Sequence, residues 1–328
     1  QVYNGYFADP FVWRHGDVYC AVGTGADTAG GSIAGTGVSN ADHERVLPLL
    51  RSRDLVAWEY VHEALIRPDA SLGNEFWAPA VAEHAGVFYL YYSVGGGKAD
   101  APGHQLRVAI AKAPEGPFTD VGPLMDAGAT PFAIDPHPFR DDDGTWYLFY
   151  ARDFLDTAHG SRAGTALVVD RLNDMVRLAG DERVVLRARH DWQLFKAQRE
   201  MYGQTWDWHT LEGPCVVLRD GMYFCFYSGA CYGNSTYGVD YATAQHVLGP
   251  YDDTGGESGA RILSTIPDRV RGPGHNSLIV GPDGNDWLVY HAWNADGSKR
   301  QMCIDRLHWS SAGPRCTPTW NVQETARL

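Results

Sequence analysis

The sequence predicts an all-β fold, a five-bladed β-propeller, in which residues 1–328 form a single domain. Three observations lead to this prediction: a composition typical of strands and turns, a hairpin pattern that recurs five times, and a proline motif ahead of each hairpin. The chain of 328 residues contains 37 glycines and 18 prolines beside 17 tyrosines, 12 phenylalanines and 11 tryptophans. Many turn formers together with many aromatic residues indicate short strands joined by turns.

The charge and hydropathy of the chain exclude several classes of protein. It carries 40 acidic and 27 basic residues, a formal net charge of −13, so we expect no nucleic-acid partner. Hydrophobic residues amount to 44% and charged residues to 20%, which excludes intrinsic disorder. No apolar run approaches the ~18 residues that a membrane helix needs, and no signal peptide is visible from Gln1 onward, so we expect no membrane partner.

The cysteines have neither the spacing of a zinc site nor a CxxC pair. Most lie in apolar, strand-like runs, so we expect buried free thiols rather than a disulfide framework. Free thiols favour a reducing compartment slightly over secretion. The cysteines are Cys20, Cys215, Cys225, Cys231, Cys303 and Cys316.

One hairpin pattern recurs along the chain: a strand, a turn that contains glycine, and an aromatic-rich strand. Asp-Gly between alternating apolar runs, as in Asp143-Gly144, is a strong hairpin signal. The turn glycines are Gly16, Gly86, Gly144, Gly221 and Gly284, so successive turns lie 70, 58, 77 and 63 residues apart. A four-stranded sheet with ordinary loops needs roughly 60–70 residues, so five sheets fit the chain. A radial array of such sheets is a β-propeller.

Two segments fit the repeat less clearly. The best helical candidate runs from Asp191 to Arg199, although this segment could equally be a loop. The glycine-rich stretch from Gly30 to Gly37 lacks the strand–turn–helix context of a nucleotide site, and we expect a loop at the rim of a pocket.

A short proline motif opens the first strand of each repeat. Three of the motifs carry an acid, which is Asp9 in the first repeat, Asp135 in the third and Glu212 in the fourth. The second and fifth motifs are Trp77-Ala78-Pro79-Ala80 and Gly272-Pro273-Gly274-His275. Because the innermost strand of each propeller blade lines the central channel, we expect the three carboxylates to meet in one pocket.

Three converging carboxylates suit the cleavage of a glycosidic bond. The reaction needs an acid for the leaving oxygen and a base or nucleophile on the opposite face of the sugar. A neighbouring carboxylate can keep the acid protonated near neutral pH. For Asp9 or Asp135 alone, the alternative is a structural Asx-turn before proline. The sequence contains neither a GxxxxGKS/T phosphate loop nor a GxSxG serine motif.

On these residues the chain resembles family 43 of the glycoside hydrolases, and the resemblance covers all five repeats. Each phrase is short, but their order and placement are specific. The stretches that carry the resemblance are Ala8-Asp9-Pro10, Phe76-Trp77-Ala78-Pro79, Ile134-Asp135-Pro136, Leu211-Glu212-Gly213-Pro214, Gly272-Pro273-Gly274-His275, and 286–291 with 300–306. One departure is Ala80, where many family members have an aspartate that is not one of the three catalytic acids.

The resemblance implies a five-bladed propeller and an inverting mechanism on plant cell-wall arabinofuranosides or xylosides. It implies that Asp9 is the general base, that Glu212 is the general acid, and that Asp135 raises the pKa of Glu212 and orients it or the sugar. Inversion places the acid and the base roughly 6.5–9.5 Å apart. The resemblance also implies a metal, typically calcium, on the propeller axis near His275. One imidazole cannot hold calcium, which prefers six to eight oxygen ligands, so waters would have to fill most of its shell.

Further residues are candidates for substrate contacts. Trp77 could form a platform for the sugar, Arg300 could contact sugar hydroxyls or balance the carboxylates, and His209 lies three residues before Glu212. The alternative for each is an ordinary packing or solvated role. His137 and His291 are candidates on the same footing as His209, Arg306 is a weaker candidate for the role of Arg300, and no organic cofactor is expected.

The predicted activity is that of an inverting exo-acting α-L-arabinofuranosidase on an oligo- or polysaccharide. A β-D-xylosidase and an endo-acting arabinanase remain alternatives. A retaining enzyme of the fructan-cleaving type is less favoured, because Ala8-Asp9-Pro10-Phe11 replaces the usual Asn-Asp-Pro-Asn opening. A non-catalytic sugar-binding propeller is a further alternative, and the sequence leaves the oligomeric state open.

Overall fold

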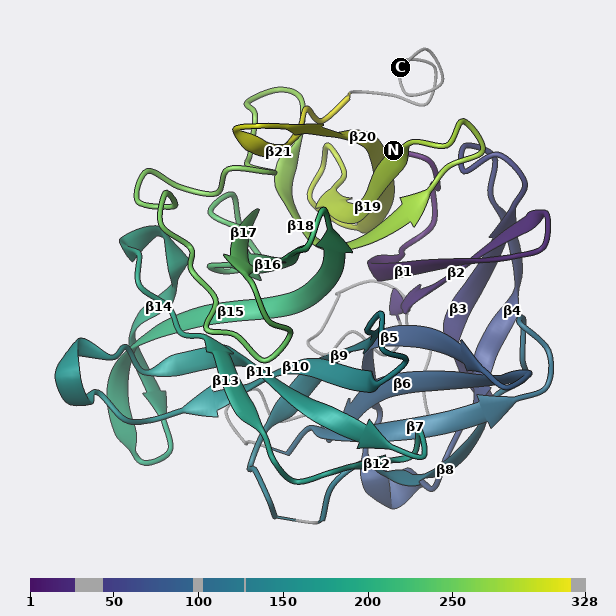
Figure 1. The fold of residues 1–328 in the computed structure, drawn as a ribbon, viewed down its shortest axis with the longest axis horizontal. Helices are drawn as coiled ribbons and strands as arrows, with labels where there is room; N and C mark the ends of the chain where they lie inside the picture. Colours follow the sequence, from purple (N-terminus) through teal and green to yellow (C-terminus); the bar gives the residue numbers. More distant parts are fainter. Residues whose placement is uncertain (27–43, 97–102, 127, 320–328) are drawn as a thin grey trace.

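The computed structural model describes residues 1–26, 44–96, 103–126 and 128–319. The predicted all-β class is confirmed, because mainly antiparallel sheets dominate the described part of the chain and its helical elements are short 3-10 turns (Figure 1). These turns are η3 (Ala70–Leu72), η4 (Ala158–Gly160) and η5 (Asp191–Gln193). None of the described helices is long and apolar enough to cross a bilayer.

The first, second and last sheets are four-stranded meanders in chain order. The first contains β1 (Ala8–His15), β2 (Val18–Thr24), β3 (Arg45–Ser52) and β4 (Glu59–Ile66). The second contains β5 (Glu75–His84), β6 (Val87–Gly95), β7 (Gln105–Ala111) and β8 (Thr119–Pro123). The last contains β18 (Arg271–Val280), β19 (Asp286–Trp293), β20 (Arg300–Ser310) and β21 (Gly313–Cys316).

The third and fourth repeats are joined in one larger sheet. The third repeat supplies β9 (Ala133–Arg140), β10 (Trp146–Phe154), β11 (Gly164–Asn173), β12 (Arg177–Leu178) and β13 (Arg183–Leu186). The fourth supplies β14 (Leu194–Met201), β15 (Gln204–Arg219), β16 (Met222–Gly229) and β17 (Gly238–Ala244). A short parallel pairing of β11 with β15, Gly164 with His209 and Thr165 with Thr210, connects the two groups.

All five predicted hairpin turns are confirmed. Each connects the first two strands of its repeat, and each turn glycine has the left-handed φ that a tight hairpin needs. The values are 59° at Gly16, 75° at Gly86, 86° at Gly144, 77° at Gly221 and 74° at Gly284.

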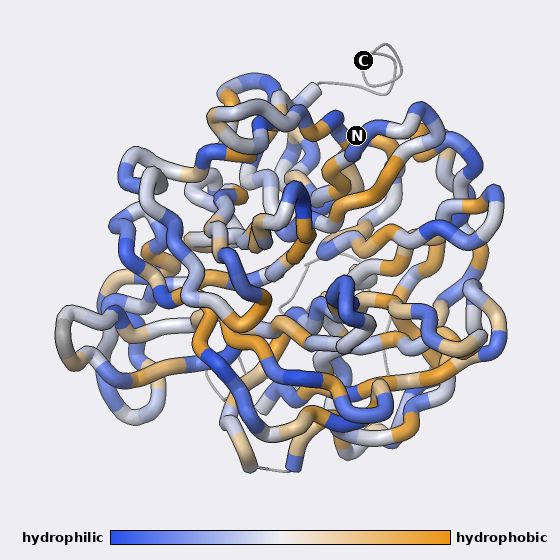
Figure 2. The backbone as a smooth tube through the Cα atoms, in the orientation of Figure 1, coloured by the Kyte–Doolittle hydropathy of each residue, from blue (hydrophilic) through white to orange (hydrophobic). Residues whose placement is uncertain are grey.

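The opening strands of the repeats lie around a common centre (Figure 1). In the described part of the chain β1 contacts β5, β5 contacts β9, β9 contacts β15, β15 contacts β18, and β18 contacts β1 again. Hydrophobic clusters fill the spaces between neighbouring repeats, so the core is distributed around the ring. One cluster joins the first and last repeats through Val12, Leu50, Met302 and Ile304. Figure 2 shows apolar stretches along the strands and hydrophilic stretches in many of the connecting loops.

The helical candidate from Asp191 to Arg199 is wrong beyond its first turn. Only Asp191–Gln193 form a 3-10 turn, and the next residues belong to β14. This strand pairs with the beginning of β15, whose length of 16 residues carries it beyond the ring. Hydrogen bonding with β15 therefore outweighs the weak helical propensity of this segment.

The free-thiol prediction is confirmed. All six cysteines are free, and the side chains of Cys20, Cys215, Cys225 and Cys303 are buried. The glycine-rich stretch from Gly30 to Gly37 lies outside the described residues.

Candidate active site

The proline motifs form bulges in the opening strands. The residue directly before proline has a left-handed φ in all five repeats: 52° at Asp9, 45° at Ala78, 59° at Asp135, 57° at Gly213 and 54° at Gly272. Strand pairing shifts register at each of these places. A residue before proline normally adopts extended backbone, and a bulge turns a side chain away from the regular alternation. The bulges therefore direct residues of separate strands toward the centre of the ring.

Glu212 occupies a different place in its bulge from the two aspartates. The residue that matches Asp9 and Asp135 in backbone conformation is Gly213, and the glutamate precedes it by one position. The repeat pattern predicts equivalent positions for the three acids, and the structure corrects the position of Glu212 by one residue. In β18 a second left-handed residue, His275 with φ 50°, follows Gly272.

The motifs meet around one small cavity of about 60 Å³. Its lining contains the three predicted acids together with predicted Trp77, Arg300 and His275. The residues that line it are Asp9, Trp77, Ile134, Asp135, Glu212, Tyr232, His275 and Arg300. A cavity of this size holds a few water molecules or part of one sugar ring.

His209 does not line this cavity, although it was a candidate for substrate binding. Its Nε2 lies 2.8 Å from Nη1 of Arg162, and its Nδ1 lies 3.0 Å from the backbone oxygen of Asp207. Because arginine only donates, Nε2 accepts and Nδ1 carries the proton that it donates to Asp207. His137 contacts the chain through Nε2, which accepts from the N–H of Val216 at 3.0 Å.

Asp9 is held by cationic and hydrogen-bonding groups. Its Oδ1 lies 3.3 Å from Nη1 of Arg300 and 3.4 Å from Nδ1 of His275. The Nδ1 of His291 lies 3.2 Å from the same oxygen and 3.1 Å from the backbone nitrogen of Asp9. The Thr24 hydroxyl donates to Oδ2 at 2.6 Å. Burial acts to raise the pKa of Asp9, but Arg300 and the two histidines outweigh it and hold the pKa far below its usual range.

Glu212 has the opposite electrostatic character. Burial and, more weakly, the charge of Asp9 raise its pKa to about 7, against the lowering effects of Tyr237 and Arg300. The Tyr237 hydroxyl donates a hydrogen bond to Oε1 at 2.6 Å. Glu212 can therefore carry a proton near neutral pH while Asp9 is ionised.

Asp135 shares its environment with Glu212. Burial, the charge of Glu212 and the charge of Asp9 raise its pKa well above the usual range, although the N–H of Gly213 donates to Oδ2 at 2.9 Å. Interaction between two charges is reciprocal, so ionised Asp135 disfavours ionisation of Glu212. The pair can hold one proton between them.

Arg300 connects the cavity with neighbouring aromatic residues that sequence reasoning missed. Its Nε donates to the Tyr6 hydroxyl at 3.0 Å, and its guanidinium lies 4.9 Å from the centre of the Tyr232 ring. Tyr237 was missed as well. None of these tyrosines stands in a proline motif or a hairpin turn, so the repeat gave no signal for them.

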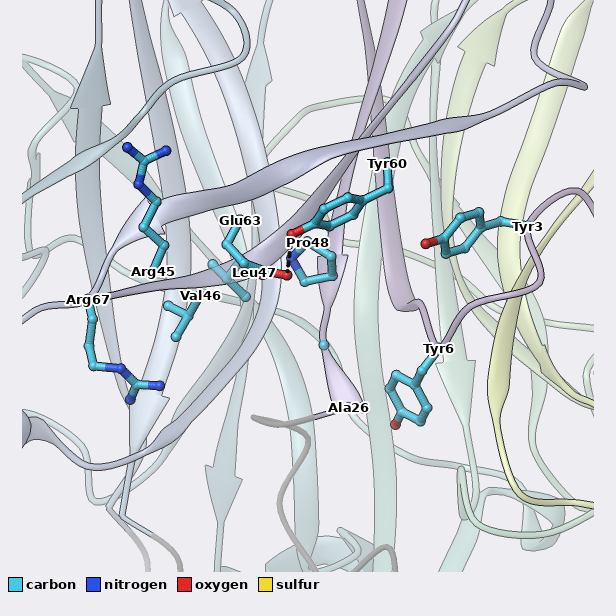
Figure 3. Close-up of a pocket in the computed structure, with 11 residues that line it drawn as sticks. Tyr3, Tyr6, Ala26, Arg45, Val46, Leu47, Pro48, Tyr60, Glu63 and Arg67 are labelled. Carbon is cyan, nitrogen blue, oxygen red and sulfur yellow. Dashed lines mark hydrogen bonds between the residues drawn. The ribbon is translucent and has the colours of Figure 1, made fainter. Parts of the chain in front are cut away.

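Tyr6 also lines a neighbouring cavity of about 230 Å³ in the first repeat (Figure 3). Tyr3, Tyr60 and Glu63 line the same space, and the Tyr60 hydroxyl donates to Glu63 at 3.2 Å. Tyr6 is thus shared between this cavity and the arginine that holds Asp9.

The residues around His275 do not suit a resident calcium ion. Among the described residues, one possible metal-binding group was found, with donor atoms of Asp135, Glu212 and His275 within 4.8 Å of one another. Calcium prefers six to eight oxygens, whereas this set offers two carboxylates and an imidazole.

Comparison with known proteins agrees with a sugar-cleaving site. The chain is 31% identical over 252 residues to the β-D-galactofuranosidase xynD of Aspergillus niger, covering 74% of this chain and 62% of that protein. It is 28% identical to the extracellular exo-α-(1→5)-L-arabinofuranosidase ArbA of Cellvibrio japonicus, over 93% of this chain and 84% of that protein. A thermostable family-43 glycoside hydrolase of known structure superposes with a TM-score of 0.79 at 30% identity, covering 97% of this chain and 95% of that one.

An all-β ring of sheets with buried carboxyls at its centre, together with these relatives, defines the chain as a glycoside hydrolase. The model of Glycosyl hydrolases family 43 matches residues 2–314, and the chain belongs to that family. The Cellvibrio cellulosa α-L-arabinanase is a further structural neighbour, with a TM-score of 0.72, 25% identity and 96% coverage of each chain.

Proposed function

We propose that this protein is an inverting exo-α-L-arabinofuranosidase built on a five-bladed β-propeller. The observation that carries the proposal is the meeting of Asp9, Asp135 and Glu212 in one small cavity. Supporting the propeller are the cyclic contacts of the five opening strands and the hydrophobic clusters between successive repeats. Residues 1–328 form one catalytic domain in this proposal.

In the proposed mechanism the two carboxyls with opposite pKa shifts act on opposite faces of the sugar. Asp9, ionised beside Arg300, takes a proton from a water molecule that attacks the anomeric carbon. Glu212, protonated near pH 7, gives its proton to the leaving oxygen as the glycosidic bond breaks. Asp135 keeps Glu212 protonated and orients it, and we expect the Asp9 and Glu212 carboxyls to lie roughly 6.5–9.5 Å apart.

The remaining lining residues position the sugar. Trp77 presents an aromatic surface to the cavity, and Arg300 both neutralises Asp9 and offers donors to sugar hydroxyls. The small cavity favours a single terminal sugar, which supports exo action over endo action. The natural partner is then an arabinose-containing oligo- or polysaccharide.

The substrate is tested with a panel of p-nitrophenyl glycosides. We expect cleavage of the α-L-arabinofuranoside to exceed that of the β-D-xylopyranoside and of the β-D-galactofuranoside. The galactofuranoside is included because one relative is a β-D-galactofuranosidase. Linear arabinan then separates the modes of action, because exo action releases only monosaccharide at first. Preferential cleavage of the xyloside, or early release of longer oligosaccharides, would replace this assignment.

The roles of the acids are tested by substitution and stereochemistry. Glu212→Gln keeps the shape of the side chain and removes its acidic proton, so turnover should fall roughly 10²–10⁴-fold while sugar binding measured by calorimetry persists. The first-formed anomer, observed by NMR, should be inverted. Wild-type turnover in the variant, or net retention, would contradict the assigned mechanism.

A further inference from the structure

Trp77, which lines the cavity, is stacked on a second ring. Its indole lies against the imidazole of His104, with ring centres 3.7 Å apart and planes inclined by 22°. The imidazole in turn lies 3.0 Å, Nε2 to Oε2, from the carboxylate of Glu75. His104 is only 6% exposed, so this contact is part of the packed interior of the second repeat.

The architecture of the second sheet explains how Glu75 and His104 can meet. Glu75 and Trp77 are two residues apart on β5, so their side chains project from the same face. His104 stands just before β7, and β6 separates it from β5. Strands two places apart lie roughly 10 Å from each other, and a side chain on the middle strand would normally fill that gap.

Gly95 leaves that gap open. It pairs with Glu75 across β5 and β6, and Val94 beside it pairs with Gln105, the neighbour of His104. A Cβ added at Gly95 would lie 2.5 Å from Cδ2 of His104. The glycine therefore makes the slot in which the imidazole lies between the carboxylate and the indole.

The same histidine reaches the strand that carries Asp135. Its backbone oxygen accepts a hydrogen bond from the N–H of Ala133 at 3.0 Å, two residues before Asp135. Its ring also meets the edge of Phe132, with ring centres 5.7 Å apart. His104 thus connects the aromatic wall of the cavity with the third repeat.

We propose that His104 and Glu75 form a positioning pair that fixes the indole of Trp77 as a sugar platform in the catalytic cavity. Nε2–H donates to the carboxylate and sets the plane of the imidazole, and the imidazole supports one face of the indole. Burial lowers the pKa of His104 against the effect of Glu75, so the ring is neutral at neutral pH. This inference rests on the proposed sugar-cleaving function of the cavity.

The test compares three substitutions with a matched control. His104→Ala removes the support, His104→Phe keeps a flat ring without the hydrogen bond, and Gly95→Ala pushes the imidazole aside. The control is His84→Ala at the other end of β5, where His84 meets the exposed edge of Trp146 with ring centres 6.1 Å apart. For each variant kcat, KM and the dissociation constant of free arabinose are measured at a temperature well below thermal unfolding.

We expect His104→Ala and Gly95→Ala to raise KM and the arabinose dissociation constant about two- to tenfold, the range of an aromatic pair, with little change in kcat. His104→Phe should restore most of the loss, and His84→Ala should match wild type. A merely structural role would lower the active fraction, and hence the apparent kcat, at constant KM. That outcome, or wild-type KM in His104→Ala, would overturn the inference and leave the proposed function standing. A wild-type chain that neither cleaves nor binds any glycoside or pentose would overturn both.

Discussion

At the scale of single residues, the site depends on giving two carboxyls of one cavity opposite proton affinities. Asp9 gains a guanidinium, two imidazoles and a threonine hydroxyl, whereas Glu212, which is partly buried, gains one tyrosine hydroxyl. Burial favours the neutral form of any carboxyl, so the contacts around Asp9 are what separate the two. Two titratable groups pushed apart in this way can serve as base and acid at the same pH.

The pH profile of kcat/KM should follow Glu212. The acid must be protonated, and its pKa of about 7 means that activity falls as pH rises above that value. The pKa of Asp9 is far lower, so this residue stays ionised across the same pH range. Its titration therefore causes no change in kcat/KM there. Tyr237→Phe removes a hydrogen bond that lowers the pKa of Glu212, so the alkaline limb should move to higher pH. Profiles from pH 4 to 9 on a p-nitrophenyl substrate measure both; a limb that moves to lower pH in the variant would contradict the assignment.

Tyr6 should contribute to catalysis through Arg300. Tyr6→Phe removes the acceptor for Nε of Arg300, leaving a buried guanidinium N–H without that partner. The loss of a hydrogen bond to a charged group costs about 1.5–3 kcal/mol, which corresponds to roughly a 10- to 100-fold fall in kcat/KM. Tyr3→Phe, in the same neighbouring cavity, is the control and should leave kcat/KM unchanged (Figure 3). Equal kcat/KM values for the two variants would show that the Tyr6 hydroxyl does not contribute to catalysis.

At the scale of elements, the hairpins and opening strands were predictable because their signals are local. Glycine in a tight turn and alternation beyond it mark each hairpin, and the proline motifs mark the strands that reach the centre. The left-handed residue before proline was not predictable, since proline ordinarily favours extended backbone there. The contacts of Tyr237 and the pairing of β14 with β15 depend on tertiary structure, so no local sequence pattern predicts them.

The junction between β11 and β15 provides a test at this scale. Gly164 has φ 150°, and a Cβ there would lie 1.8 Å from the backbone oxygen of His209. Gly164→Ala must push the two strands apart, so we expect the free energy of unfolding to fall by about 3 kcal/mol or more. Gly16→Ala is the control, because its φ of 59° is also left-handed but no atom lies within 4 Å of the added Cβ. That variant should lose only about 1–2 kcal/mol in denaturant titrations, and an equal loss in both would show that close strand contact is unimportant.

At the scale of the whole molecule, the site exists because the ring of sheets closes. Asp9 belongs to the first repeat, whereas Arg300 and His291, which hold it, belong to the last. The sequence predicted this convergence from the order of the repeats and named Arg300 as a residue that could balance the carboxylates, but it did not predict that His291 and His275 would contact Asp9 as well. The N-terminal segment pairs with β20, where the N–H groups of Val2 and Phe7 donate to the oxygens of Met302 and Arg300. Closure of the ring therefore brings the first and last repeats together at the site.

Phe7 should be a principal contributor to closure. It is fully buried in the cluster between the first and last repeats, and its ring packs edge-to-face with that of Tyr3, with ring centres 5.9 Å apart. Phe7→Ala leaves a cavity at the seam, so we expect a loss of about 3–5 kcal/mol of stability. Because Phe7 is two residues before Asp9, kcat/KM should fall as well, even at temperatures where the variant stays folded.

The control is Phe195→Ala on β14, where the ring is partly exposed beside Arg199. It should cost less than about 1 kcal/mol and leave kcat/KM unchanged, since β14 lies outside the ring of opening strands. Calorimetry and initial rates on the same preparations separate the two effects. A Phe7→Ala variant with lower stability but the wild-type kcat/KM would show that packing between the first and last repeats stabilises the fold without positioning Asp9.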